Sequence, residues 1–170
     1  MFEDETDVML FPPVRSGWTK KGEPADVEIC GGNAKRVVFG TISLTGHRLL
    51  LIRRKQRAVD FQAFLNLVHE HYRQRQVMLI LDGDSSHTAQ SSRQLAKELK
   101  IMLEWLPVRS PELNAIEDVW GDAKDTICAN HQFPDIDTEA EQFVNHIEQM
   151  TNQEAKRKAG LLSDNYWLFQ

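Results

Sequence analysis

The sequence predicts an α/β protein in which a mixed central β-sheet is flanked by α-helices, and three observations support this fold class. Apolar residues recur at helical spacing over about residues 59–73. Residues 77–81 form a continuously apolar run, which is typical of a strand buried on both faces. Strand-like and helical segments also alternate along the chain, as a sheet with helices on its faces requires. With 170 residues, the chain suits a single domain over residues 1–170.

The first third of the chain is predicted to be mostly β-structure. Asp4 lies in an acidic cluster, at the end of a short first strand with only two or three residues before it. Residues 26–29 and 35–44 are rich in strand-forming residues. The turn residues Thr45-Gly46-His47 then lead into a partner strand over residues 48–52, which predicts a hairpin.

The remaining part of the chain is predicted to alternate between helices and strands. The elements after residue 81 are a helix over 85–100, a strand over 101–105, a helix that begins at Asn114 and a long helix over 138–159. In the long helix, Thr138 and Glu141 have the spacing of a capping box, and Gly160 suits the C-cap. Trp105 and Trp120 are expected in the core.

Composition excludes several classes of protein. No apolar run approaches the roughly 18–20 residues that a membrane span needs, and residues 1–5 lack the features of a signal peptide. Cys30 and Cys128 form no CxxC pair, which argues against a zinc knuckle and against a disulfide framework. We therefore expect a cytoplasmic protein with no membrane partner.

Charge is distributed unevenly, although the net charge is only −5. Residues 111–154 contain eleven acidic residues and one basic residue, whereas residues 8–110 contain sixteen basic and nine acidic residues. A polyanionic partner would therefore contact the middle of the chain. The alternative is that these clusters are only solvated surfaces.

Three acidic residues occupy positions that suit catalytic carboxylates. Asp82 ends the most hydrophobic predicted strand, at the edge where open α/β sheets bind ligands. Asp4 ends the short first strand, and Glu117 lies in the first turn of the helix that begins at Asn114. Carboxylates from two strands and a helix can converge on a pair of cations. Such hard oxygen ligands favour Mg²⁺ or Mn²⁺, which polarise a phosphodiester.

Each of these residues also has a purely structural interpretation. Asp82 followed by Gly83 has the composition of a turn before a helix. Asn114-x-x-Glu117 has the form of a capping box, in which Glu117 would only satisfy backbone N–H groups. Asp4 would then belong to a frayed acidic terminus. Spacing by itself does not decide between the catalytic and the structural interpretation.

The local sequence around the three acids resembles one known family. The strings are Phe2-Glu3-Asp4-Glu5, Leu81-Asp82-Gly83-Asp84-Ser85-Ser86-His87 and Leu106-Pro107-Val108-Arg109-Ser110-Pro111-Glu112-Leu113-Asn114-Ala115-Ile116-Glu117-Asp118-Val119-Trp120. Together they resemble the catalytic domain of mariner-type transposases, in the bacterial insertion-sequence branch of the DDE superfamily. Thirty-four residues lie between Asp82 and Glu117, which is the interval typical of that group, and Lys124 falls where the family often has a lysine.

This resemblance implies an RNase H-like fold in which Asp4, Asp82 and Glu117 are the catalytic residues and bind two Mg²⁺ or Mn²⁺ ions. The implied function is metal-dependent DNA cleavage and strand transfer in DNA transposition. The implied partners are transposon-end DNA, target DNA with a TA dinucleotide, and either a second copy of the chain or a full-length transposase. The implied location is the cytoplasm, in association with the nucleoid.

The sequence departs from the family pattern in a few places. Gly83 stands where the family usually has Asn, and Ala115 stands where it usually has Pro. We also expect that the N-terminal helix-turn-helix region of full-length relatives is absent from this chain. The alternative function is therefore a catalytically inactive remnant that acts as a binding or oligomerisation module.

Several further residues are candidates for DNA contact. They are Trp18, Lys20 and Lys21 in a predicted loop, the basic residues Arg53, Arg54, Lys55 and Arg57, and also His87 and Lys124. The run over residues 53–57 suits either phosphate contacts or a solubilising hairpin end. His87 suits either a role facing the active site or a structural hydrogen bond.

Overall fold

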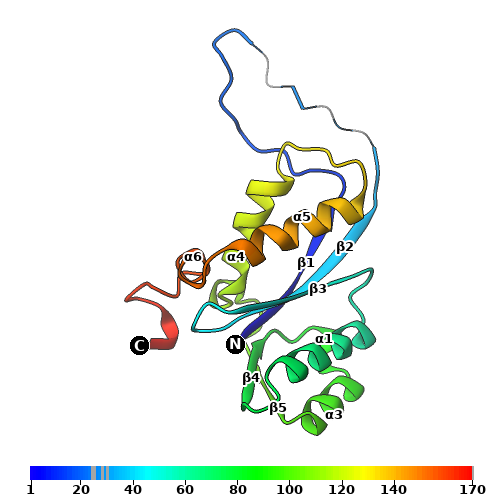
Figure 1. Cartoon of the computed structure of the whole chain (residues 1–170), viewed down its shortest axis with the longest axis vertical. Coiled ribbons are helices and arrows are strands. Elements are labelled where there is room, and N and C mark those ends of the chain that lie inside the picture. Colours follow the sequence, from blue (N-terminus) through cyan, green and yellow to red (C-terminus); the bar gives the residue numbers. More distant parts are fainter. Residues whose placement is uncertain (24–25, 28, 30, 170) are drawn as a thin grey trace.

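The computed structural model of the protein describes residues 1–23, 26–27, 29 and 31–169, and it contains a five-stranded mixed sheet (Figure 1). The strands are β1 (Phe2–Met9), β2 (Lys35–Ile42), β3 (Arg48–Arg53), β4 (Val77–Leu81) and β5 (Ile101–Trp105). Their order in the sheet is β3-β2-β1-β4-β5. The β1–β2 and β2–β3 pairs are antiparallel, whereas the β1–β4 and β4–β5 pairs are parallel. The mixed sheet expected from the sequence is thus confirmed.

Helices cover both faces of this sheet. They are α1 (Ala58–His71), α2 (Ser85–Thr88), α3 (Gln90–Glu98), α4 (Ile116–Ala123), α5 (Ile136–Gln149) and α6 (Asn152–Lys158), with a π-helical turn over Lys124–Cys128 and 3-10 turns over Pro111–Leu113 and Trp167–Phe169. α1 and α3 lie on one side of the sheet, and α4 and α5 lie on the other (Figure 1). No helix in the described part of the chain is both long and apolar enough to cross a lipid bilayer.

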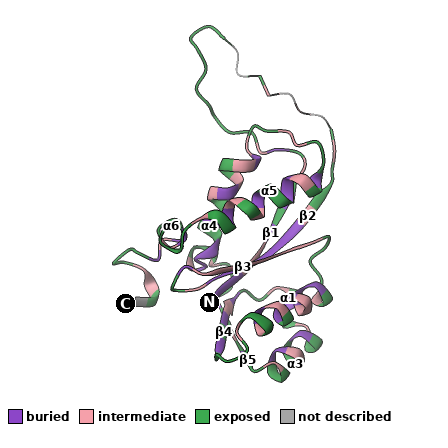
Figure 2. Ribbon diagram, in the orientation of Figure 1, coloured by how far each residue is buried: buried purple, intermediate pink, exposed green. Residues whose placement is uncertain are grey.

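The sheet separates two hydrophobic cores because side chains alternate between the faces of a strand. On the side of α4 and α5, Val38 and Ile42 of β2 pack with Trp120 and Phe143. On the side of α1 and α3, the intervening Phe39 packs with residues of α1, β4 and β5. Buried positions accordingly line the inner surfaces of the helices and the central strands in Figure 2.

The first strand differs from the expectation. β1 has eight residues, Phe2–Met9, and Asp4 is its third residue rather than its last. The four acidic residues at positions 3–7 hid the strand pattern, because charged residues seldom occupy central strands. The strand forms here because its entire length pairs with β2, and because buried Glu3 and Glu5 face His87. The interpretation of Asp4 as part of a frayed terminus is therefore wrong.

The predicted long helix over residues 138–159 is two helices. α5 begins after Asp135, whose side chain accepts a hydrogen bond from the Thr138 backbone N–H, so the expected capping box at Thr138 is wrong. Thr151 and Glu154 form a reciprocal capping box that starts α6. Gly160 follows α6 with a φ of 67°, as expected for a C-terminal glycine. The predicted helix over 85–100 is also divided, because Ala89 separates α2 from α3.

Two smaller expectations need correction. The predicted strand over residues 26–29 includes Glu28, which lies outside the described residues, and none of its described residues belongs to a strand. Trp120 is buried as expected, but Trp105 is 39% exposed because it ends β5 at the edge of the sheet.

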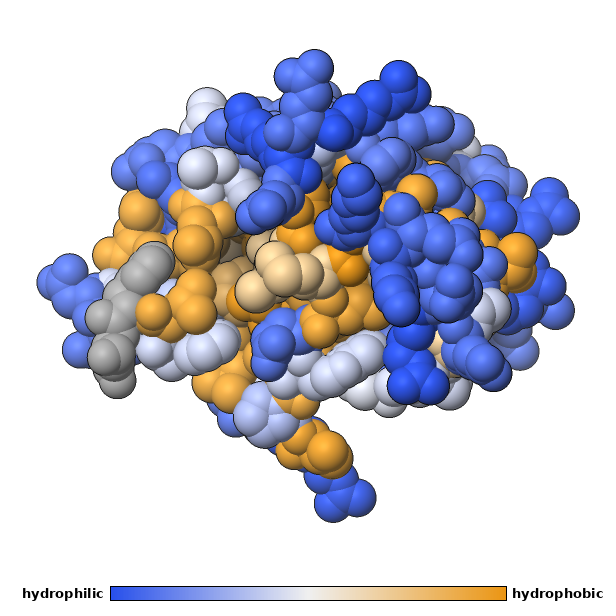
Figure 3. Space-filling view, turned by 90° about the horizontal axis from the view of Figure 1, so that it is seen from below, coloured by the Kyte–Doolittle hydropathy of each residue, from blue (hydrophilic) through white to orange (hydrophobic). Residues whose placement is uncertain are grey.

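Apolar side chains gather in the middle of the surface seen in Figure 3, with polar ones around them.

Residues 10–23, here called the projecting segment, extend from the body of the molecule after β1 (Figure 1). The base of this segment is tied to the turn that follows α4. Arg15 pairs with Asp125 at 2.9 Å, and the Arg15 backbone N–H donates to Asn130 Oδ1 at 2.9 Å. These contacts fix the base of the segment through residues 110 and 115 positions apart in the chain.

Candidate active site

Asp4, Asp82 and Glu117 line one cavity of about 330 Å³. They come from β1, from the residue directly after β4, and from the first turn of α4. The cavity is also lined by Gly83, Asp84, Leu106, Pro107, Val108, Arg109, Ser110, Pro111 and Asn114. The parallel β1–β4 pair explains the meeting of Asp4 and Asp82, because the two strands run side by side in the same direction.

Asp4 is held from the α4 side of the sheet. The indole Nε1–H of Trp120 donates to Asp4 Oδ2 at 3.1 Å. Burial, together with the negative charges of Glu117 and Glu5, raises the pKa of Asp4 to about 8. A bound cation would lower this pKa again, because positive charge favours the ionised carboxylate.

Asp82 is oriented by two donors that reach the same oxygen. Its Oδ1 accepts a hydrogen bond from the Asp84 backbone N–H at 2.9 Å and lies 3.0 Å from Nδ1 of His87. The hydrogen bond with His87 lowers the pKa of Asp82, burial opposes this effect, and the bond from Asp84 adds to it. Asp82 does therefore shape the turn, as the structural interpretation proposed, but its side chain is also 58% exposed at the cavity.

Glu117 does not cap its helix. The N-cap of α4 is Ala115, and this end of the described helix has no side-chain cap. Asn114 instead donates from Nδ2 to the Glu3 carbonyl oxygen at 2.9 Å, which ties the start of α4 to β1. The capping-box interpretation is therefore wrong, and the Glu117 carboxylate faces the cavity.

The electrostatics of Glu117 reflect its neighbours. Burial raises its pKa, Lys124 opposes this rise, and the charges of Asp118 and Asp82 add to it. Asp4, Asp82 and Glu117 thus share an excess of negative charge that protein cations only partly offset. Hard carboxylate oxygens in such surroundings fit a divalent cation of the Mg²⁺ or Mn²⁺ type.

His87 lies behind the cavity and is fully buried. Its Nε2 is 2.8 Å from Glu5 Oε1 and 3.5 Å from Glu3 Oε2. Burial alone would lower the pKa of His87, but the charge of Glu3 and the hydrogen bonds with Asp82 and Glu5 raise it to about 11. The assignment of His87 to DNA contact is wrong, because a side chain with no exposed surface cannot touch DNA.

The remaining DNA-contact candidates fall into separate groups. Trp18 is fully exposed, and Lys20 and Lys21 are exposed with it in the projecting segment. Lys20 lies only 4.0 Å from Glu23, at the limit of an ion pair. Lys124 lies instead near the cavity, where its charge acts on Glu117.

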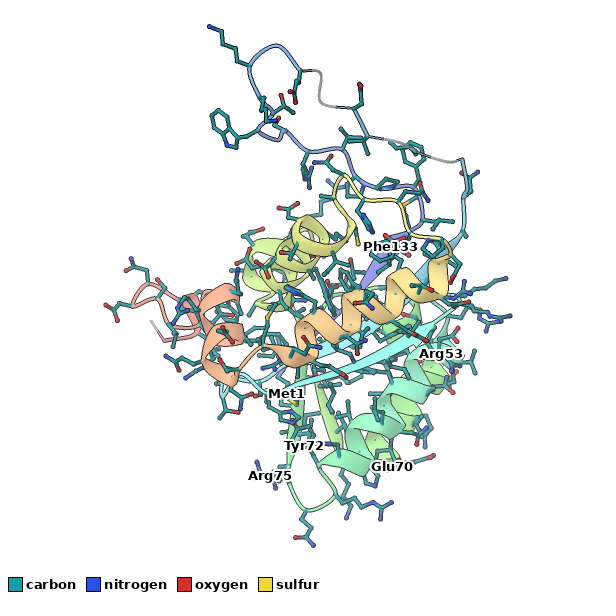
Figure 4. All side chains as sticks on the ribbon, turned by 45° about the horizontal axis from the view of Figure 1, so that its top comes forward. Met1, Arg53, Glu70, Tyr72, Arg75 and Phe133 are labelled. Atoms are coloured by element: carbon teal, nitrogen blue, oxygen red, sulfur yellow. The ribbon has the colours of Figure 1, made fainter. Side chains whose placement is uncertain are left out.

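The basic residues that follow β3 do not all have the same role. Arg53 and Arg57 both donate to buried Asp60, at 3.0 and 2.8 Å, so these two side chains stabilise the start of α1. Figure 4 shows Arg53 at the edge of the body beside α1. Arg54 and Lys55 are exposed. The structure therefore leaves Arg54 and Lys55 as the candidates with charges available to phosphates.

Sequence reasoning missed several residues that shape the site. Arg109 and Ser110 line the cavity, and Arg109 adopts a φ of 62°, which is uncommon for a residue other than glycine. Glu5 and Trp120 act on the catalytic candidates from opposite faces of β1. The alternation of side chains along a strand could have identified Glu5, because it places Asp4 on one face of β1 and Glu5 on the other.

The fold and this cavity together define an RNase H-like catalytic domain. The chain belongs to the DDE superfamily endonuclease family, whose model matches residues 1–138. Among curated proteins, it is 30% identical over 134 residues to an insertion element IS630 uncharacterized 39 kDa protein of Shigella sonnei, covering 77% of this chain and 39% of that protein. It is also 36% identical over 72 residues to the transposable element Tc3 transposase of Caenorhabditis elegans, covering 39% of this chain and 22% of that protein.

Solved structures show the same fold. The Mos1 transposase paired-end complex with left transposon end matches with a TM-score of 0.72 at 16% identity, covering 97% of this chain and 52% of that chain. The catalytic domain of Mos1 mariner transposase matches with a TM-score of 0.63 at 16% identity, covering 95% and 75%. The resemblance to DDE transposases and the RNase H-like fold are thus confirmed. The chain spans less than two-fifths of the length of either curated relative.

Proposed function

We propose that the chain is the catalytic domain of a transposase and carries out metal-dependent DNA cleavage and strand transfer. The observation that carries this proposal is the convergence of Asp4, Asp82 and Glu117 on one cavity in a member of the DDE superfamily. The three acidic positions are complete in this chain, and no described contact diverts Glu117 into helix capping. These facts support an enzyme over an inactive remnant.

Two Mg²⁺ or Mn²⁺ ions are the proposed cofactors, and Asp4, Asp82 and Glu117 are the residues that would hold them. When bound, such ions polarise the phosphodiester and activate an attacking oxygen. The hard donor set of the cavity supports this proposal. It is also supported by the Mos1 paired-end complexes, which have been solved with Mn and with Mg.

The proposed reaction has two displacements at phosphorus. Water first attacks the phosphodiester at a transposon end, a new P–O bond forms, and the 3′-oxygen leaves and takes up a proton. The freed 3′-OH then attacks target DNA at a TA dinucleotide, releasing a 3′-OH of the target. In this chain Trp120 orients Asp4, and the Asp84 backbone N–H and His87 orient Asp82. No covalent enzyme intermediate is required.

The proposed partners are transposon-end DNA, target DNA, and either a second copy of the chain or a full-length transposase. A Mos1 paired-end complex and a Mos1 strand transfer complex support DNA as the substrate. DNA contacts are assigned to Trp18 and Lys21 in the projecting segment and to Arg54 and Lys55 after β3. The proposed location is the cytoplasm, at the nucleoid, where such DNA lies.

Nicking of a supercoiled plasmid tests the proposal. The wild-type chain should nick DNA with Mn²⁺ or Mg²⁺ and not with EDTA, and Asp82→Asn and Glu117→Gln should lose this activity while keeping the wild-type circular dichroism spectrum. Asp118→Asn is the matched control, because it changes the carboxylate next to Glu117 on α4 but outside the cavity lining. Asp118→Asn should retain nicking. Undiminished nicking by Asp82→Asn or Glu117→Gln would overturn the site assignment.

A further inference from the structure

A buried polar cluster lies on the face of β1 opposite to the cavity carboxylate Asp4. Because side chains alternate along a strand, Glu3 and Glu5 point away from α4 and towards His87 of α2. One oxygen of each carboxylate and a ring nitrogen of His87 lie within 4.8 Å of one another. Neither carboxylate oxygen of Glu3 has a hydrogen-bond partner among the described residues.

His87 connects this cluster to the cavity. Its Nδ1 lies 3.0 Å from Asp82 Oδ1, and its Nε2 lies 2.8 Å from Glu5 Oε1. An ionised carboxylate can only accept hydrogen bonds, so the ring nitrogen that faces an ionised Asp82 is a donor. The ring also packs against Phe61, with 4.5 Å between the ring centroids. Three contacts on different sides therefore fix the orientation of the imidazole.

The short segment that carries His87 is fixed as well. Asp84 Oδ1 accepts a hydrogen bond from the Ser86 backbone N–H at 2.7 Å, and the Ser92 hydroxyl donates to the Ser86 carbonyl oxygen at 2.6 Å. Ser92 is fully buried at the inner side of α3. These two hydrogen bonds restrain the backbone of the segment that carries His87.

We propose that His87 is a positioning residue that holds the Asp82 carboxylate ready to bind a divalent cation, with Glu5 anchoring the far side of the imidazole ring. This inference rests on the proposed function, since it assigns Asp82 to cation binding. The hydrogen bond from Nδ1 fixes one oxygen of Asp82 and so limits the rotation of a side chain that is otherwise half exposed. Partners that orient a metal-binding side chain in this way typically contribute one to two orders of magnitude in metal affinity.

Two substitutions test the two ring nitrogens of His87 separately. In His87→Asn the amide nitrogen lies near the position of Nδ1, so it can still donate to Asp82. In His87→Gln the amide group lies nearer the position of Nε2, so it reaches Glu5 instead of Asp82. Mn²⁺ binding to the full 170-residue chain is measured by isothermal titration calorimetry. His87→Gln should bind Mn²⁺ roughly 10–100-fold more weakly than wild type, and His87→Asn should fall between His87→Gln and wild type.

His146→Gln is the matched control. His146 also pairs with an aspartate, since its Nε2 lies 3.2 Å from Asp122 Oδ2, but neither residue lines the cavity. This variant should keep the wild-type Mn²⁺ affinity. Melting temperatures without metal identify any loss of folding, so that only variants with a wild-type transition are compared.

A measurement on the wild-type chain removes the dependence on mutants. The ¹⁵N resonance of His87 Nδ1 should shift on addition of Mg²⁺, whereas the His146 resonances should not. Equal Mn²⁺ affinities for wild type and a folded His87→Gln, or a His87 resonance that does not respond to bound Mg²⁺, would overturn the inference and leave the proposed function standing. A wild-type chain that binds no divalent cation would refute both. Loss of one bound ion in Glu3→Gln but not in Asp82→Asn would place a cation in the buried cluster and contradict the positioning role.

Discussion

Substitution of Gly40 by alanine tests how closely the sheet supports the Asp4 side of the cavity. Gly40 pairs with Asp4 across the β1–β2 ladder, and the ring of Trp120 lies directly over it. A Cβ atom at Gly40 would lie 2.4 Å from Cη2 and 2.8 Å from Cζ2 of Trp120, and 2.8 Å from Cδ2 of Leu50. These separations are far shorter than van der Waals contact, so the indole ring must move.

The expected loss of stability in Gly40→Ala follows from the packing around the indole ring of Trp120. Trp120 is 1% exposed and stacks on Phe143 with 6.0 Å between centroids, so it has little space to move. Overpacking of this kind costs about 1–3 kcal/mol in the free energy of unfolding. For a chain of this size, that loss corresponds to a fall of roughly 2–12 °C in melting temperature. Displacement of Trp120 also removes its hydrogen bond to Asp4, so Mn²⁺ affinity should fall as well.

Urea unfolding followed by circular dichroism measures the effect. Gly121→Ala is the control, because a Cβ atom at Gly121 has nothing within 4 Å and replacement of an exposed helical glycine stabilises by up to about 1 kcal/mol. Trp120→Phe removes the ring atoms that Gly40→Ala would strike, so the cost of Gly40→Ala should be smaller in that background. A Gly40→Ala chain that unfolds at the wild-type urea concentration or higher would refute this reasoning.

Three further predictions concern the metal, the α1 ion pairs and DNA. Mn²⁺ should raise the melting temperature of the wild type, with a gain in stability of about 2.7 kcal/mol at 100 times Kd that grows with the logarithm of the Mn²⁺ concentration. An unchanged rise in Asp4→Ala/Asp82→Ala would place the ion elsewhere. Burial alone would raise the pKa of Asp60, but hydrogen bonds from Arg57 and Arg53 hold it below its usual value. Asp60→Asn should therefore cost about 1.5–3 kcal/mol in urea unfolding at pH 7. The difference from wild type should begin to shrink below about pH 4 and be lost as the pH falls through the lowered pKa of folded Asp60; a difference independent of pH would contradict this. In gel shifts the chain should bind duplex DNA weakly, lose binding steeply with salt and show no preference for transposon ends. Trp18→Ala should weaken this binding without changing its salt dependence. Tight, end-specific binding at high salt would contradict the assignment of these residues to phosphate contacts.

Local sequence patterns predicted much of the fold correctly. The apolar run at residues 77–81 and the strand at 101–105 have the predicted bounds, and α1 lies within two residues of its predicted ends. These elements depend on side-chain periodicity and on turn residues, which are properties of neighbouring positions. The choice of Asp4, Asp82 and Glu117 likewise depended on short strings of sequence around each acid.

The long-range contacts were not available from the sequence. β1 was predicted to be short because four acids obscure its alternation, and only the structure shows that Glu5 meets His87, which lies 82 positions away. The structural alternative of a capping box at Asn114 was likewise not decided by the sequence, and in the structure Asn114 donates to the Glu3 carbonyl oxygen 111 positions earlier. In both cases the side chain contacts a distant residue that no local pattern identifies.

The sequence by itself therefore determined most of the elements, the resemblance to the family and the choice of Asp4, Asp82 and Glu117. Only the tertiary structure decided that Asp4 has a pKa of about 8, that Asp82 is oriented by His87, and that Glu117 faces the cavity instead of capping α4. The physical reason is that the periodicity and turn residues that indicate helices and strands are properties of residues a few positions apart. The charge state and orientation of a carboxylate depend instead on burial and on the distances to other charges and donors, and folding brings those groups together from remote parts of the chain.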